Sequence, residues 1–258
     1  MLRRILFAFL IAIPSIAHTA GEPPLHVGTG IRVITPDPLL PVSGGLGPTR
    51  PATEKRGEIT ARAVVLQKGE TTVAIVSLDL LGFPSVLGDR VRKNVPRIPA
   101  ENILIGSTHG HSSPDCYAFP DGKGGHTGDL DYMNFVCTKT AEAINDALDR
   151  LQPASIKIAT AEAEGKIAYN YYAPDLYDRR MSVIQAVGRD DKTIFTLVNY
   201  AVHPEVLGPG VGILSPDLVG PLCDKIEAKA GGGAIFRQEG VGGVHHREGI
   251  RLFNFLNP

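Results

Sequence analysis

The stretch Asn102–Asp115 reads NILIGSTHGHSSPD and joins a short apolar run to two histidines. Ile103–Ile105 is typical of a buried strand, and the small residues after it lead to His109 and His111. Ser112–Pro114 then predicts a turn that takes the chain away from the strand. Because a buried polar group without partners costs roughly a few kcal/mol, two imidazoles beside a core indicate that the site supplies hydrogen-bond partners or a metal ion.

The composition is that of an ordinary globular protein. At 258 residues the chain has room for one large domain or two small ones. Its hydrophobic content of 43% and charged content of 21% are enough for a sizeable core. The formal net charge is -1 and the basic residues are scattered along the chain, so we expect no nucleic-acid partner.

The N-terminus has the pattern of a secretory signal peptide. Met1–Arg4 is basic, and Ile5–Ile13 is an apolar run too short to span a bilayer. The alternative is an uncleaved anchor, which the short apolar run and Pro14 disfavour. We therefore predict a signal peptide over residues 1–20, with export to the periplasm or the medium. The rest of the sequence contains no run apolar enough to predict a membrane span.

The three cysteines, Cys116, Cys137 and Cys223, are too few for a disulfide framework, although one bridge after export is compatible with the count. Cys137 and Cys223 fall in helical patterns and are predicted to be small core residues. None of the three has the C-x-x-C spacing of a metal site.

The hydrophobic pattern predicts strands with interspersed helices and hairpins. Lys68-Gly69-Glu70 joins two β-rich runs and predicts a hairpin, and apolar residues recur at helical spacing from Leu130 to Leu151. The predicted fold class is α/β, with a mixed β-sheet and flanking helices. The predicted strands are 27–34, 59–67, 72–78, 103–105, 155–161, 181–187, 193–200 and 234–236. The predicted helices are 84–95, 130–151 and one that begins at Ser215-Pro216-Asp217.

A third histidine, His203, also follows an apolar strand and precedes a glycine-rich loop. Strand ends at one edge of a sheet are where α/β proteins gather their sites. Residues i and i+2 of a strand share a face, so His109 and His111 are predicted to converge. Neutral imidazoles bind zinc, and a catalytic ion keeps one position for water. The alternative is that backbone groups satisfy all three rings.

Asp79 has two alternative interpretations. Asp79 ends a predicted strand, where it serves either as a site carboxylate or as the cap of a turn or helix. His126 lies in the glycine-rich loop that runs from Tyr117 to Gly128.

Ile103–Pro114 and Asn199–Asp217 resemble the two signature segments of the neutral/alkaline (non-lysosomal) ceramidases. The family's T-H-T-H-S-G-P segment stands here as THGHSSP over Thr108–Pro114, and its A-x-H-P segment as AVHP over Ala201–Pro204. The opening GTGIRVITPDP and the later EITARAVVL and VAIVSLDLLG also fit the family. The likeness therefore runs from about Val27 to Phe236.

The resemblance implies an enzyme that uses one Zn²⁺ ion to cleave the amide bond of N-acylsphingosine, giving a fatty acid and sphingosine. By position, His109 and His203 would be zinc ligands. His111 would contact the substrate amide or stabilise the oxyanion that develops on its carbonyl. The implied partner is a lipid-like amide of the ceramide class, with peripheral contact to a membrane.

The chain departs from the family toward its C-terminus. The family's other zinc ligands, a Glu and a Tyr, have no counterpart here, and Gly240–His246 lacks the serine of the family's G-D-V-S-P-N segment. The family's Asn-Arg pair reads Asn170-Tyr171. We expect a partial ceramidase-like N-terminal domain over 21–236 and a divergent or frameshifted tail over 237–258. Such a chain is expected to leave sheet edges uncovered and to be poorly soluble.

Two alternatives stand beside this interpretation. An amidohydrolase-type metal enzyme also places H-x-H at a strand end, but it requires an eight-fold strand–helix barrel, for which this chain is short and hairpin-rich. The other alternative is a metal-binding remnant without catalytic activity.

Overall fold

One mixed sheet of eight strands dominates the computed structural model, which describes residues 22–45, 49–165, 168–170, 172–238 and 244–246. Its strands are β1 (Leu25–Val33), β3 (Thr60–Lys68), β4 (Thr71–Leu78), β5 (Ile103–Ser107), β6 (Gln152–Glu162), β8 (Arg180–Gly188), β9 (Thr193–Tyr200) and β11 (Gly233–Gln238). Their order across the sheet is β11-β9-β8-β6-β1-β3-β4-β5. The pairs β4–β5 and β9–β11 are parallel and the other neighbours antiparallel. The predicted mixed α/β class is confirmed, and the eight-fold barrel of the amidohydrolase alternative is not found.

The remaining described elements are helices and short strands. The helices are α1 (Ser85–Lys93), α2 (Leu130–Asp149) and α3 (Val219–Ala230), with two 3-10 turns, η1 (Ala100–Asn102) and η2 (Pro209–Val211). The short strands are β2 (Glu54–Lys55), β7 (Ala168–Asn170), β10 (Ile213–Leu214) and β12 (Val244–His246), of which β2 pairs with β10 and β7 with β12. None of the described helices is both long and apolar enough to cross a membrane. The predicted signal peptide lies outside the described residues, as does most of the tail predicted over 237–258.

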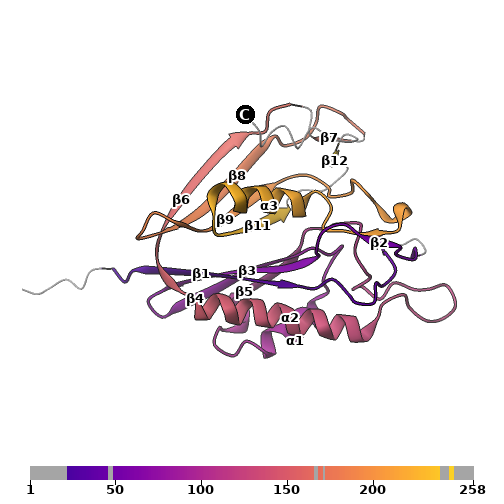
Figure 1. Cartoon of the computed structure of the whole chain (residues 1–258), viewed down its shortest axis with the longest axis horizontal. Helices are drawn as coiled ribbons and strands as arrows, with labels where there is room; N and C mark the ends of the chain where they lie inside the picture. Colours follow the sequence, from indigo (N-terminus) through magenta and orange to yellow (C-terminus); the bar gives the residue numbers. More distant parts are fainter. Residues whose placement is uncertain (1–21, 46–48, 166–167, 171, 239–243, 247–258) are drawn as a thin grey trace, which may run out of the picture.

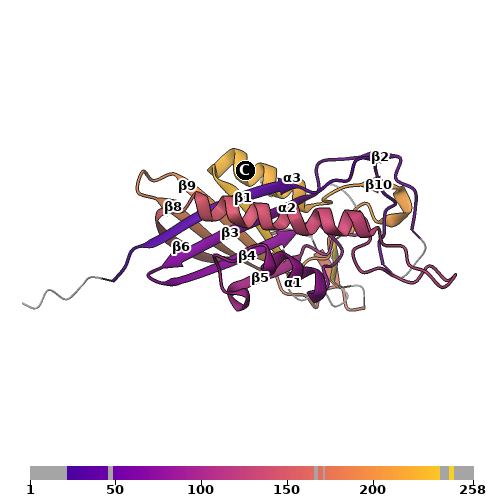
Figure 2. The ribbon, with the colours of Figure 1, turned by 90° about the horizontal axis from the view of Figure 1, so that it is seen from below.

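The sheet bends so that its two halves face each other as two layers. Helices α1 and α2 cover the outer face of the β1-β3-β4-β5 half, and α3 covers the half that contains β9 and β11 (Figure 1). Seen from below, α2 runs along β1 and β3 (Figure 2). The alternation of strand side chains produces this packing. On β9, Phe195 lies in the core between the two halves, whereas Val198 packs in the core beneath α3.

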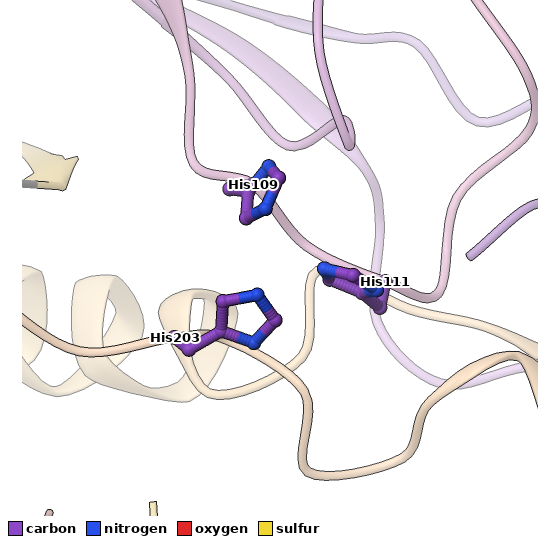
Figure 3. Close-up of side chains that lie close together, drawn as sticks. All are labelled: His109, His111 and His203. Atoms are coloured by element: carbon purple, nitrogen blue, oxygen red, sulfur yellow. The ribbon is translucent and has the colours of Figure 1, made fainter. Parts of the chain in front are cut away.

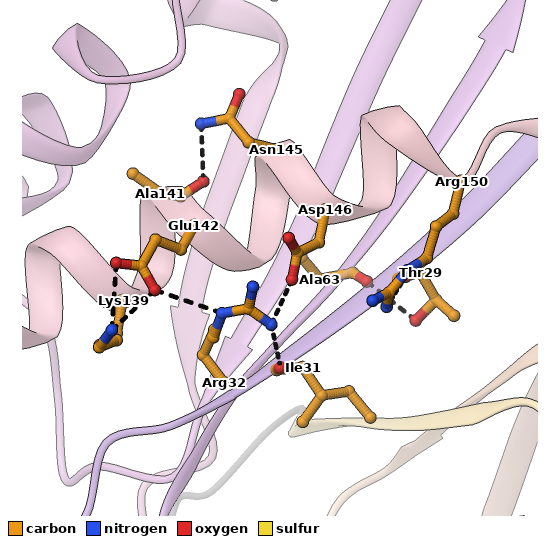
Figure 4. Close-up of polar contacts among 10 residues, drawn as sticks. All are labelled: Thr29, Ile31, Arg32, Ala63, Lys139, Ala141, Glu142, Asn145, Asp146 and Arg150. Atoms are coloured by element: carbon orange, nitrogen blue, oxygen red, sulfur yellow. Dashed lines mark hydrogen bonds and ion pairs between the residues drawn. The ribbon is translucent and has the colours of Figure 1, made fainter.

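Glycines on β1 allow α2 to lie very close to the sheet. A Cβ atom at Gly28 would stand 2.0 Å from the carbonyl oxygen of Ala147, and one at Gly30 would stand 2.1 Å from that of Ala143. Further along β1, Arg32 reaches back to α2 and forms ion pairs with Glu142 and Asp146 (Figure 4). The strand therefore contacts the helix through its backbone at one end and through charged side chains at the other.

Polar contacts tie the two halves together inside the molecule. Arg62 on β3 forms an ion pair with Glu227 on α3 and donates to the carbonyl oxygen of Ala234 on β11 at 3.0 Å. The hydroxyl of Ser77 on β4 donates to the carbonyl oxygen of Phe236 at 2.6 Å. These contacts fix how the ends of β4 and β11 meet, and the site lies close to those ends.

Asp79 has a structural role at the end of β4. Its carboxylate accepts hydrogen bonds from the backbone N–H of Thr60 at 2.9 Å and from the Thr60 hydroxyl at 2.6 Å. It is not among the residues that gather with the histidines. Neither alternative for this side chain is observed among the described residues: the carboxylate bonds across the β3–β4 pair to Thr60, which is neither a turn cap nor a helix cap.

The predicted elements are all present, with one start displaced. The third helix begins at Val219 rather than at Ser215, because Asp217 has a φ of 54°, a left-handed conformation that a helix cannot contain. Cys137 and Cys223 are buried core residues as predicted, and Cys116 is buried as well. All three cysteines are free thiols.

Candidate metal centre

Two of the three histidines stand on the loop that leaves β5. The backbone N–H of Thr108 still bonds to the carbonyl oxygen of Leu78 at 2.8 Å, and the strand geometry ends there. His109 then adopts a φ of 64°, which is uncommon for a residue other than glycine and marks a constrained position. The i, i+2 spacing predicted that the two rings converge because they share a strand face, and this reason is wrong. They converge because the left-handed turn at His109 redirects the chain.

The third histidine arrives from the other half of the sheet, after β9. The ring centroids of His109 and His203 are 4.9 Å apart, and those of His111 and His203 are 4.4 Å apart. One ring nitrogen from each of the three residues lies within 4.8 Å of the others, close enough to share a metal ion (Figure 3). The structure thus brings together all three histidines singled out in the sequence. His126 is exposed on its loop and is not part of the group.

Backbone carbonyls hold two of the rings from behind. Nδ1 of His109 lies 2.8 Å from the carbonyl oxygen of Leu81, and Nδ1 of His111 lies 2.8 Å from that of Gly44. A carbonyl oxygen can only accept, so in each neutral ring Nδ1 carries the proton and Nε2 keeps its lone pair. Both rings therefore present a nitrogen of the kind that zinc requires.

Glu205 stands behind the third ring. Its Oε2 lies 3.2 Å from Nδ1 of His203, and its Oε1 lies 3.6 Å from Nδ1 of His111. The backbone N–H of Glu205 donates to the carbonyl oxygen of His203 at 3.0 Å, which forms a tight turn directly after the histidine. The carboxylate therefore lies within reach of two of the three rings.

Several buried polar atoms near the histidines have no hydrogen-bond partner among the residues that the structure describes. They include Nε2 of His111 and the hydroxyl oxygens of Ser107, Thr108 and Ser112. Buried polar groups are rarely left unsatisfied, so such a concentration indicates a place where a ligand or ordered water belongs. Burial also lowers the pKa of His111, which Glu205 opposes and His109 reinforces, so the neutral ring that a metal needs is favoured. The donor set and the unsatisfied nitrogen both fit a zinc-like ion.

Backbone hydrogen bonds join the two loops that carry the histidines. The N–H of His111 donates to the carbonyl oxygen of Pro204 at 3.2 Å, and the N–H of Ser215 donates to that of Ser112 at 2.9 Å. The buried carboxylate of Asp217 accepts from the N–H groups of Val206 and Leu207, each at 3.0 Å. The loop after His203 is therefore held at both of its ends.

Sequence reasoning did not identify Glu205 or Asp217. Both lie within the segment that resembles the family's second signature, but neither has a spacing from the histidines that predicts contact. The signal that could have drawn attention to Glu205 is its place two residues after His203, in a loop whose only other acidic residue is Asp217. Asn170 ends β7, outside the group of histidines, and Gly240–Gly243 lie outside the described residues.

Two solved structures share the fold. The crystal structure of neutral ceramidase from Pseudomonas aeruginosa matches 87% of this chain with a TM-score of 0.69 and 19% sequence identity. A structure described as ceramidase complexed with C2 matches 86% of the chain with a TM-score of 0.65 and 20% identity. This chain corresponds to only 40% and 39% of those two chains. No family model and no curated protein sequence matches it. At this level of identity the likeness establishes the fold.

Proposed function

We propose that this chain is a zinc-dependent amide hydrolase of the ceramidase type that acts on a lipid-like amide. The observation that carries the proposal is the convergence of His109, His111 and His203 at the strand ends of a fold shared with neutral ceramidase. Both matched structures are described as ceramidases, one of them as complexed with C2, and we extend the ceramide class of substrate to this chain.

The three rings take two roles in this proposal. His109 and His203 would hold the ion through Nε2. With its proton on Nδ1, His111 presents an Nε2 lone pair that would accept a hydrogen bond from the substrate amide N–H. The alternative role, stabilising the developing oxyanion, would require Nε2 to carry a proton. When bound, Zn²⁺ supplies Lewis-acid polarisation of the carbonyl oxygen. The carbonyl oxygens of Leu81 and Gly44 orient the rings of His109 and His111 and place the proton of the neutral form on Nδ1.

Zinc content of the purified full chain tests the metal assignment. His109→Ala and His203→Ala are each expected to lower bound zinc at least ten-fold, because each removes one of two proposed ligands. His126→Ala is the matched control, since that histidine is exposed and stands apart from the site. Unchanged zinc in both ligand variants would remove the metal from the proposal.

Release of fatty acid from N-acylsphingosine tests the chemistry and the role of His111. His111→Ala is expected to retain zinc and to lose roughly a hundred-fold in kcat/KM, because it removes a side chain that positions the substrate amide. Loss of zinc from this variant would instead make His111 a third ligand.

A non-catalytic metal-binding protein is the second candidate, favoured by the absence of serine from Gly240–His246. A folded, zinc-loaded chain without any hydrolytic activity would favour this candidate over the hydrolase.

We also propose export, which rests on the signal-peptide pattern over residues 1–20. Mass spectrometry of protein recovered from a secretion-competent host is expected to give an N-terminus that follows Ala17 or Ala20. Recovery of the chain with Met1 still attached would contradict cleavage. A lipid substrate further implies peripheral contact with a membrane, which co-sedimentation with ceramide-containing vesicles would detect.

A further inference from the structure

The three histidines are not held in the same way. His109 and His111 each have a backbone carbonyl oxygen at 2.8 Å from Nδ1, whereas Nδ1 of His203 faces the carboxylate of Glu205 at 3.2 Å. A carboxylate differs from a carbonyl in carrying a full negative charge, and its hydrogen bonds to a ring N–H are stronger. His203, which comes from the other half of the sheet, is therefore the ring whose Nδ1 lies nearest to a carboxylate.

We propose that Glu205 is a positioning residue, whose carboxylate accepts the Nδ1 proton of His203 and so turns the Nε2 lone pair toward the bound ion. This inference rests on the metal site of the proposed function. A carboxylate behind a ligating imidazole fixes its tautomer and raises its basicity. Glu205 also brings one negative charge close to the group of imidazole rings, which favours a divalent cation at their centre.

The loop around Glu205 is built to keep the carboxylate in place. The backbone N–H of Glu205 bonds back to the carbonyl oxygen of His203, and the next two N–H groups bond to the carboxylate of Asp217. The Glu205 side chain is one-third exposed, at 33%, so it lies at the rim of the site and not in the core. Replacing it therefore leaves the packing of the fold intact.

Glu205 also reaches His111, from which its other oxygen lies 3.6 Å away. The same carboxylate thus lies behind one proposed zinc ligand and behind the ring proposed to contact the substrate. At this distance the carboxylate acts on His111 through its charge, because Nδ1 of that ring is already bonded to the carbonyl oxygen of Gly44 at 2.8 Å. Glu205 therefore positions His203 and contributes negative charge near His111.

The tautomer of His203 in the metal-free chain gives the first test. Nitrogen NMR at a pH above the ordinary histidine range is expected to find the His203 proton on Nδ1 in the native protein. In Glu205→Ala the proton is expected to distribute over both nitrogens, and Glu205→Gln is expected to restore the Nδ1 form, since its amide oxygen still accepts. An unchanged tautomer in Glu205→Ala would overturn the inference, whether or not the chain binds metal.

Zinc affinity gives the second test. Glu205→Ala is expected to weaken zinc binding ten- to hundred-fold, and Glu205→Gln to recover part of that loss. Glu164→Ala, at an exposed glutamate on another loop, is the matched control and is expected to leave the affinity unchanged. Native affinity in Glu205→Ala would overturn the inference and leave the zinc site standing. Native protein that binds no zinc would overturn the proposed function instead, and the NMR result would still report on Glu205.

Discussion

At the scale of single residues, Asp79 shows how a carboxylate can be buried without belonging to the site. Burial raises its pKa to about 6, although hydrogen bonds from Thr60 and the charge of Arg62 act in the opposite direction. The unfolded chain, in contrast, releases this proton near 3.8. Between pH 3.8 and about 6, the Asp79 carboxyl is therefore protonated in the folded protein and ionised in the unfolded chain.

This difference predicts a pH dependence of stability. The contribution of Asp79 is fully present below pH 3.8 and is lost as the pH rises through about 6, because the folded state must then bury a charge. The loss amounts to roughly 3 kcal/mol, from about two pKa units of difference. Urea unfolding measured from pH 4 to pH 7 should show this decline, and Asp79→Asn should flatten it. Asp175→Asn, at an exposed position, is the control; an equally steep decline in Asp79→Asn would contradict the assignment.

The residues of the site were predictable from sequence only in part. His109, His111 and His203 could be predicted because each follows an apolar strand into a loop of small residues, and strand ends gather at a sheet edge. The way in which the three rings meet could not be predicted, because nothing in the sequence indicates the φ of 64° at His109. Glu205 escaped prediction because its contact with two rings depends on where two separate loops cross.

At the scale of elements, β1 and α2 are in close backbone contact. Gly30→Ala would place a methyl group 2.1 Å from the carbonyl oxygen of Ala143, which belongs to the helix backbone and cannot move aside cheaply. We expect a loss of about 3 kcal/mol in the free energy of unfolding, typical of overpacking. Gly210→Ala, which meets no atom within 4 Å, is the control. Chemical denaturation measures both, and equal stability of the two variants would show that the helix can retreat from the strand.

The helices and strands could be predicted from the hydrophobic periodicity and from the turn-forming residues between them. The hairpin at Gly69 and the helix from Leu130 were predicted within a few residues, because apolar spacing decides both. The start of α3 was wrong by four residues, since Ser215-Pro216 has the form of a helix start and the left-handed Asp217 breaks it. Tertiary hydrogen bonds from Val206 and Leu207 to Asp217 outweighed the local preference.

At the scale of the whole molecule, β6 leaves an uncovered edge. It pairs with β1 only through Gln152 and Pro153, so along Ala154–Glu162 it is bonded only to β8 among the described strands. Ile158 on this strand is 74% exposed. An exposed apolar strand edge is a template for pairing between chains, which agrees with the expected poor solubility.

Ile158→Lys is therefore expected to lower self-association, because a charge on an edge strand opposes pairing. Val86→Lys is the control, since Val86 is 59% exposed but lies on α1. Light scattering of both variants at the same concentration measures the effect. An equal decrease in self-association in the two variants would show that the added charge causes the effect, whether or not it lies on the strand edge.

The three histidines come from both halves of the sheet, so a shared ion would affect the whole chain. His109 and His111 follow β5 in one half of the sheet, and His203 follows β9 in the other. An ion shared between them would be a cross-link between distant parts of the sequence, and it would stabilise the native state by mass action. Docking of the two halves and binding of the ion are then thermodynamically linked. A substitution that lies outside the site and weakens the contact between the two halves, such as one at Arg62, is therefore expected to weaken zinc binding as well.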